Sequence, residues 1–146
     1  MRSLTFGLVL LLPAAALAEP IETQKIITAA TGDWNGDGAI DLAMIVETEP
    51  GHPMDLYFFL KDRDGNFLKP AEVVHEQIYG EWKDYDRPGP AASDTEPELT
   101  ALPNGSIKLY IPAMEIGSER TNKTLTIAWR NGAFVVAGFA YEYWTT

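Results

Sequence analysis

The chain has 146 residues, no cysteine, and 21 acidic against 11 basic residues, which gives a formal net charge of −10. A negative surface repels phosphate backbones and anionic lipid headgroups, so the composition argues against nucleic acid as a partner. Without cysteine the chain can form neither disulfides nor the cysteine-based lipid anchor of bacterial exported proteins.

The first residues have the pattern of a secretory signal peptide. Arg2 precedes an apolar run from Leu4 to Leu12, and Ala16-Leu17-Ala18 matches the small-x-small cleavage pattern. The run is shorter than the roughly 20 residues that a membrane-spanning helix needs, and no later apolar run is long enough to span a bilayer. We therefore expect a signal peptide over 1–18, no membrane anchor, and an exported protein, periplasmic or secreted. The remaining 146 − 18 = 128 residues, 19–146, are expected to form a single β domain.

Short β-branched and aromatic runs separated by turn residues predict a mainly β fold. We expect an antiparallel, β-sandwich-like meander of seven to eight strands with a long irregular loop. The expected strands are Lys25–Thr31, Asp41–Glu47, Met54–Lys61, Ala71–Tyr79, Leu99–Leu102, Ser106–Pro112, Asn122–Arg130 and Ala133–Trp144. The fourth of these could equally be a two-turn helix, because Val74 and Ile78 are spaced four residues apart.

Three short segments predict hairpin turns. Asn104-Gly105 and Asn131-Gly132 each predict a tight type I′ turn, because Asn and Gly readily adopt the positive φ that both central residues need. Asp62–Asn66 predicts a third hairpin connection. Asp62 and Asp64 have no further ligands beside them in the sequence, so they are interpreted as turn residues rather than as a metal site.

The pattern of strands breaks down between Gly80 and Glu98. Loops longer than about 12 to 15 residues are either functional or irregular excursions. Trp82 and Tyr85 favour a loop that packs or binds something, and a solvated surface excursion is the alternative.

The segment from Asp33 to Asp41 places oxygen-bearing side chains at alternate positions around a glycine. Calcium takes six to eight oxygen ligands, so a calcium loop must turn sharply and direct several oxygens inward. Gly38 supplies conformational freedom at the sixth loop position. The pattern predicts a Ca²⁺ site, with a loop that uses Asp, Asn and Gly only as turn formers as the alternative. The predicted metal ligands are Asp33, Asn35, Asp37, Asp41 and the main-chain carbonyl of Ala39.

The stretch Gly32-Asp33-Trp34-Asn35-Gly36-Asp37-Gly38-Ala39-Ile40-Asp41-Leu42-Ala43 resembles the FG-GAP or VCBS-type repeat of integrin-like β-propellers. In that family the Asp-x-Asn-x-Asp-Gly-x-x-Asp-Leu loop binds calcium between two strands, so the resemblance implies the same ligand set and a strand beginning at Leu42. It covers only about residues 25–48. A propeller has four to eight blades, and a single motif copy excludes one. The family's ligand-binding roles therefore do not transfer.

An EF-hand is excluded by the same loop. Met44 stands at the twelfth position, where an EF-hand has a bidentate glutamate, and the flanking residues favour strands over helices. With few charged ligands, we expect the weak affinity of extracellular calcium modules, about 10⁻⁴ to 10⁻³ M.

No catalytic motif is present, and the only histidines are His52 and His75. We therefore expect an exported, non-enzymatic protein with one structural calcium loop. The alternative is an acidic interaction module that binds a basic protein, such as a lysozyme-type enzyme, through its surface and the 80–98 loop. A carbohydrate-active enzyme with paired carboxylates is a third interpretation.

Aromatic residues near the C-terminus are expected to supply the core and its rim, with a carbohydrate-binding platform as the alternative: Trp129, Phe134, Phe139, Tyr141, Tyr143 and Trp144.

Overall fold

The structure, a computed structural model, describes residues 20–50, 52–64, 66–78, 96–112 and 119–145. These residues form eight strands in two four-stranded antiparallel sheets and no α-helix. No helix in this part of the chain is long and apolar enough to cross a membrane. The predicted signal peptide, 1–18, and most of the predicted 80–98 loop lie outside the described residues.

Each sheet is a simple meander, because strands that follow one another in the chain are also neighbours in the sheet. The first sheet contains β1 (Lys25–Gly32), β2 (Asp41–Glu47), β3 (Met54–Lys61) and β4 (Leu68–Ile78). The second contains β5 (Glu98–Ala101), β6 (Ile107–Ile111), β7 (Glu119–Arg130) and β8 (Ala133–Thr145). The predicted mainly β, antiparallel, sandwich-like meander is confirmed.

The predicted segment Ala71–Tyr79, whose sequence suited a strand and a helix equally, is a strand over its described residues and belongs to β4. Val73 and Val74 pair with Tyr57 and Leu56 of β3, so the segment continues the sheet as far as Ile78. The helical alternative is wrong, because β-branched residues pack well against a neighbouring strand and two turns of isolated helix would gain little. Tyr79, the last residue of the predicted strand, lies outside the described residues.

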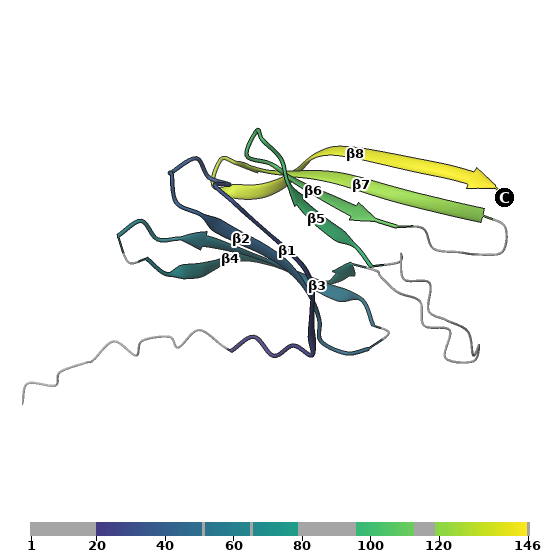
Figure 1. The fold of residues 1–146 in the computed structure, drawn as a ribbon, viewed down its shortest axis with the longest axis horizontal. Coiled ribbons are helices and arrows are strands. Elements are labelled where there is room, and N and C mark those ends of the chain that lie inside the picture. The colour runs from purple at the N-terminus through teal and green to yellow at the C-terminus, as the bar shows by residue number, and fades with distance from the viewer. Residues whose placement is uncertain (1–19, 51, 65, 79–95, 113–118, 146) are drawn as a thin grey trace, which may run out of the picture.

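The core lies between the two sheets, which form two layers in Figure 1. The ring of Phe58 on β3 stacks on Phe134 of β8 with 4.1 Å between the ring centroids. At one side the edge strands β1 and β5 meet, and the Leu99 main-chain N–H donates to the Thr28 hydroxyl at 3.2 Å. Residues from both sheets therefore share one hydrophobic core, whose largest fully buried members are Phe58, Ile45, Ile107 and Leu109.

The two Asn-Gly hairpins use different turns. Asn131 and Gly132 have φ values of 53° and 80°, as the predicted type I′ turn requires. In the β5–β6 hairpin only Gly105 has positive φ, at 80°, and its N–H donates to the Leu102 carbonyl at 3.1 Å. The hairpin is present, but the predicted type I′ geometry is wrong there. Pro103 is the physical reason, because its fixed negative φ occupies the first central position of the turn.

The predicted hairpin connection at Asp62–Asn66 joins β3 to β4. The Asp62 N–H donates to the Phe67 carbonyl at 2.9 Å, and the Asn66 N–H donates to the Asp62 carbonyl at 3.0 Å. Asn66 has a φ of 57°, a left-handed conformation that Asn tolerates better than most residues.

Candidate functional site

The predicted calcium loop connects β1 to β2. Gly36 and Gly38 have φ values of 75° and 85°, so the chain turns through left-handed conformations at both glycines. No heavy atom lies within 4 Å of a Cβ built on either glycine, which means that backbone conformation rather than crowding demands glycine there. The predicted role of Gly38 in the turn is therefore confirmed.

Three of the predicted ligands gather inside the loop. Asp33 accepts the Asp37 N–H at 3.0 Å through Oδ1 and the Gly38 N–H at 2.8 Å through Oδ2. Asn35 Oδ1 also accepts the Asp37 N–H, at 3.1 Å, and Asn35 Nδ2 donates to Asp37 Oδ2 at 3.2 Å. Asp37 Oδ1 accepts the Ala39 N–H at 2.8 Å. Side-chain oxygens and main-chain N–H groups thus hold the loop in one compact turn.

Asp41 occupies a different position from the other predicted ligands. Its side chain is fully buried, at 0% exposure. Oδ2 accepts the Trp34 N–H and Oδ1 accepts the Lys61 N–H, both at 2.8 Å. Because Lys61 ends β3 and Trp34 belongs to the loop, this carboxylate fastens the loop to the third strand of the sheet. A carboxylate that accepts two N–H groups away from water makes strong hydrogen bonds.

Trp34 anchors the loop in the core. Its side chain is buried and belongs to the main hydrophobic cluster. The six-membered ring lies against Gly32, where a Cβ would come within 2.3 Å of Trp34 Cζ3. A side chain at residue 32 would therefore push the indole out of its place. Trp34 and Asp41 together hold the loop from the inside, so the oxygens of Asp33, Asn35 and Asp37 are placed on a rigid support.

Within the part of the chain that the structure describes, basic side chains do not balance the charge of the loop. Among the described residues, no Lys, Arg or His forms an ion pair with Asp33, Asp37 or Asp41. In the same part of the chain, no three Asp, Glu or His side chains come together as a metal-holding group. The donor set is instead two carboxylates, the Asn35 amide oxygen and the Ala39 carbonyl. These are all hard oxygen donors, the type that calcium prefers, and each carboxylate oxygen keeps a second lone pair.

An open cavity of about 530 Å³ lies beside the loop. The loop residues Asp33–Gly36 form one wall, and the β5–β6 turn at Asn104–Ser106 forms another. Residues of the β7–β8 hairpin complete it, including Trp129, Arg130 and Gly138. One side of the predicted calcium loop therefore faces a hollow whose other walls belong to the second sheet and its turns.

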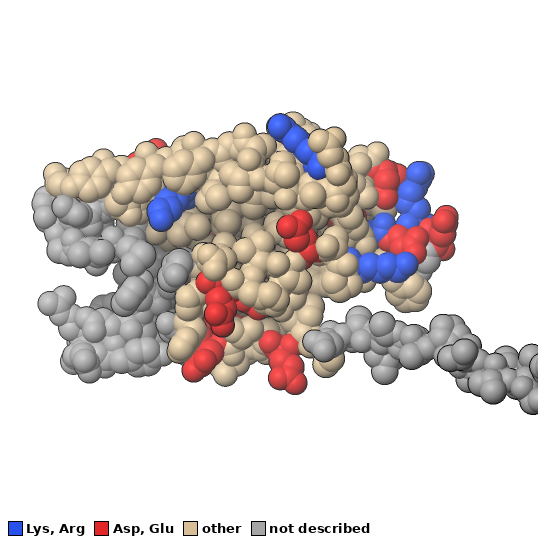
Figure 2. Space-filling view, turned by 180° about the vertical axis from the view of Figure 1, so that it is seen from behind, with Lys and Arg blue, Asp and Glu red and all other residues tan. Residues whose placement is uncertain are grey.

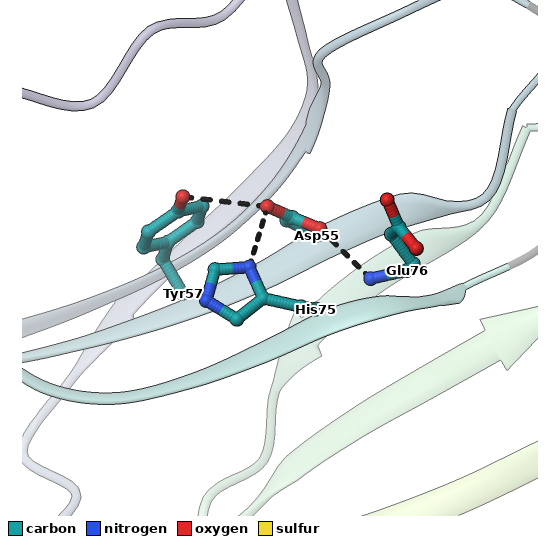
Figure 3. A network of polar contacts seen from close by, with 4 residues as sticks. All are labelled: Asp55, Tyr57, His75 and Glu76. Atoms are coloured by element: carbon teal, nitrogen blue, oxygen red, sulfur yellow. Dashed lines mark hydrogen bonds and ion pairs between the residues drawn. The ribbon is translucent and has the colours of Figure 1, made fainter.

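A second polar network lies on the first sheet, between β3 and β4 (Figure 3). Asp55 is buried, and its Oδ1 accepts the Glu76 N–H at 2.8 Å. Its Oδ2 lies 3.0 Å from His75 Nδ1 and 3.4 Å from the Tyr57 hydroxyl. Burial raises the pKa of the Tyr57 hydroxyl, and the charge of Asp55 and the hydrogen bond to it act in the same direction.

This network stabilises an irregular point in the sheet. Glu76 has a φ of 51°, and the β3–β4 register shifts between Met54 and Leu56. Such a bulge leaves a main-chain N–H outside the regular ladder, and Asp55 accepts it. The His75 side chain is 68% exposed, and among the described residues no Ser or Thr hydroxyl hydrogen-bonds to it. Asp55, His75 and Glu76 therefore link β3 to β4. A carboxylate inside the apolar run Met54–Lys61 was the sequence signal for it.

The other candidate residues belong partly to the surface and partly to the core. His52 lies 3.4 Å from Glu49, and both side chains are largely exposed. Trp129 and Phe134 pack edge to face with 4.9 Å between their centroids, as expected for core residues. The remaining aromatic residues of the C-terminal run are exposed: Phe139, Tyr141, Tyr143 and Trp144.

A comparison with family models, curated proteins and solved structures finds no significant match for this chain. The resemblance of the loop to an FG-GAP or VCBS-type repeat therefore stays a prediction, which rests on the motif alone. We therefore infer the function from the geometry and chemistry of the described residues.

Proposed function

We propose that this protein is a non-catalytic β module whose Asp33–Asp41 loop binds one calcium ion, and that the ion stabilises the fold. One observation carries the proposal: the side-chain oxygens of Asp33, Asn35 and Asp37 share a single tight loop. The two carboxylates in it have no basic partner among the described residues. Two negative charges in one small loop repel each other, and a divalent cation removes that repulsion.

The predicted ligands have different roles in this proposal. Asp33, Asn35, Asp37 and the Ala39 carbonyl would provide the oxygens that face the ion. Asp41 supports the loop from beneath, because both of its oxygens accept main-chain N–H groups. Each oxygen of Asp41 also keeps one free lone pair, through which the carboxylate would coordinate the calcium ion directly. The first two strands, which the loop connects, would gain most from the ion, because the loop determines how the chain reverses between them.

Calcium would act as a ligand of the folded state. An ion that binds the native loop and not the unfolded chain raises the free energy of unfolding by about 2.7 kcal/mol when its concentration is one hundred times the dissociation constant. With the weak affinity expected for such a site, one millimolar calcium is about one to ten times the dissociation constant and adds about 0.4 to 1.4 kcal/mol. The stabilisation therefore requires calcium at the millimolar level of extracellular surroundings. The proposed export of the protein is consistent with that requirement.

The test is a thermal melt of the purified protein in chelator, in millimolar calcium, and in millimolar magnesium. We expect calcium to raise the melting temperature more than magnesium does. Asp37→Ala should abolish the calcium-dependent rise, because it removes one of two charged donors in the loop. The matched control is Asp64→Ala, which removes a carboxylate from the exposed turn after β3 and should leave the rise unchanged. Equal calcium-induced shifts in wild type and Asp37→Ala would contradict the proposal.

A further inference from the structure

β8 is an edge strand with an unusual amount of exposed apolar surface. It is 13 residues long, ends the second sheet, and pairs with β7 alone among the described strands. Phe139 is 63% exposed and Tyr141 is 51% exposed. An edge strand presents unpaired N–H and C=O groups along its whole length, so a long apolar edge favours pairing with another strand.

Two of the exposed rings of β8, Phe139 and Tyr141, lie on the core-facing side of the second sheet. Phe139 pairs with Leu125 and Tyr141 pairs with Lys123, and residues opposite each other share a face. Leu125 packs against the core, so Phe139 and Tyr141 continue the same face. β7 and β8 extend beyond the end of the first sheet in Figure 1, which explains why these rings are not covered by it.

The two outer edges, β4 and β8, differ in how they are protected. β4 contains Pro70, which has no N–H to offer, and its pairing with β3 is irregular at two points. It also has several polar or charged residues, namely Lys69, Glu72, His75 and Glu76. Prolines, charges and bulges are the usual means by which proteins prevent edge-to-edge pairing. β8 has a single bulge, no proline and only one charged residue, Glu142.

We propose that β8 pairs in antiparallel fashion with β8 of a second copy of this chain. The net charge of −10 opposes self-association over most of the surface, but the β8 edge is nearly uncharged. Figure 2 shows this contrast, since the strip along the upper edge carries few charged side chains. A basic partner would find a single carboxylate on β8, whereas a second β8 matches it in polarity along its length. A two-fold axis makes such a contact closed and self-complementary.

The register that suits self-pairing is centred on Tyr141. The part of β8 that would pair begins at Gly138, after the bulge between Val136 and Gly138, where the strand becomes regular. In this register Tyr141 lies opposite its own copy and Glu142 lies opposite Ala140, so no like charges meet. Trp144 lies opposite Gly138, where a large ring covers a residue that has no side chain. Aromatic residues opposite glycine are a known way to stabilise such positions.

The first experiment is sedimentation equilibrium of the purified protein over a wide concentration range. We expect a monomer–dimer equilibrium that Tyr141→Lys weakens by about tenfold or more, because two lysines would then meet at the axis. Gln77→Lys adds the same charge to the exposed β4 edge and should leave the dimer intact. Circular dichroism of both variants checks that the fold is retained. A protein that stays monomeric, or a dimer that both variants weaken equally, would overturn the proposal.

Cross-linking tests the register itself, since the chain contains no cysteine. Opposite residues of an antiparallel pair have Cα atoms about 4.5 to 5.5 Å apart, within the span of a disulfide. Tyr141→Cys should therefore form a covalent dimer under mild oxidation. Phe139→Cys should not, because its Cα would lie about 13 Å from that of its copy, four residues along the strand. Equal cross-linking of the two variants would overturn the proposed register.

Discussion

Two loops of the first sheet use the same residue types and handle their charge in different ways. Asp33–Asp41 connects β1 to β2, and Asp62–Asn66 connects β3 to β4. In the second loop, Asp62 Oδ2 forms an ion pair with Lys69 at 2.7 Å, and Oδ1 accepts the Asp64 N–H at 3.0 Å. In the first loop, the carboxylates accept main-chain N–H groups, and no basic side chain of the described residues pairs with them.

The difference shows what separates an ion-binding loop from a turn. Both loops need Asp, Asn and left-handed backbone, so composition alone does not distinguish them. Asp62 has its charge balanced by Lys69, and it gains little from a cation. Asp33 and Asp37 have oxygens gathered in one turn, and among the described residues N–H groups rather than basic side chains offset their charge. The calcium response should therefore belong to the first loop alone.

The largest effect on stability is expected from Asp41→Ala. The substitution leaves the N–H groups of Trp34 and Lys61 without their acceptor in a buried position. At about 1 to 3 kcal/mol for each unsatisfied buried donor, the loss of unfolding free energy should be about 2 to 6 kcal/mol. Urea unfolding in chelator measures it, with Asp64→Ala as the control in the other loop. Similar stability of the two variants would show that Asp41 does not fasten the loop.

A smaller effect is expected from Gly38→Ala. The φ of 85° is unfavourable for a residue with a Cβ, although nothing in the surroundings would clash with it. The cost should be about 1 to 2 kcal/mol in urea unfolding, the usual cost of a left-handed residue. Asn66→Gly is the matched change in the other loop, where residue 66 already has positive φ, and it should be neutral or slightly stabilising. Equal destabilisation by both changes would mean that φ does not explain the need for Gly38.

The smallest effect is expected from Lys69→Met, which removes the ion pair of the second loop. The Lys69 side chain is 66% exposed and the Asp62 side chain 32%, so solvent and salt screen the pair. The loss should be about 0 to 1 kcal/mol at low salt and should vanish at high salt. Urea unfolding at two ionic strengths measures it. A larger loss that persists in high salt would show that the pair does more than balance charge at a turn.

The strands were predictable because their signals are local. Alternating β-branched and aromatic residues marked seven of the eight strands to within a few residues, whereas the fourth was equally consistent with a helix. Asn131-Gly132 marked its hairpin and its turn type. The division into two sheets of four was not predictable, because no local pattern states which neighbouring strands stop pairing. The turn at Asn104-Gly105 differs from the predicted type I′ geometry because Pro103, with its fixed negative φ, occupies the first central position.

The site was predictable in part for the same reason. The tight turn at Gly38 and the gathering of Asp33, Asn35 and Asp37 follow from their spacing within one loop. The contact of Asp41 with Lys61 depends on which residue of β3 comes opposite, and sequence spacing does not contain that information. Asp55 and His75 are 20 residues apart and meet through the β3–β4 register. The carboxylate inside an apolar run was a local signal for a buried Asp55, but no local pattern indicated its partner.

Calcium binding by the Asp33–Asp41 loop is tested most directly by NMR. Calcium is titrated into the protein while amide chemical shifts are recorded in two-dimensional spectra, with magnesium as the comparison. We expect saturable shifts of the Asp37, Gly38 and Ala39 amides with calcium, because their N–H groups donate to the carboxylates that would hold the ion. The amides of Asp64 and Asn66 in the second loop should not move. Stationary amides in the first loop, or equal shifts in both loops, would contradict the calcium-binding role.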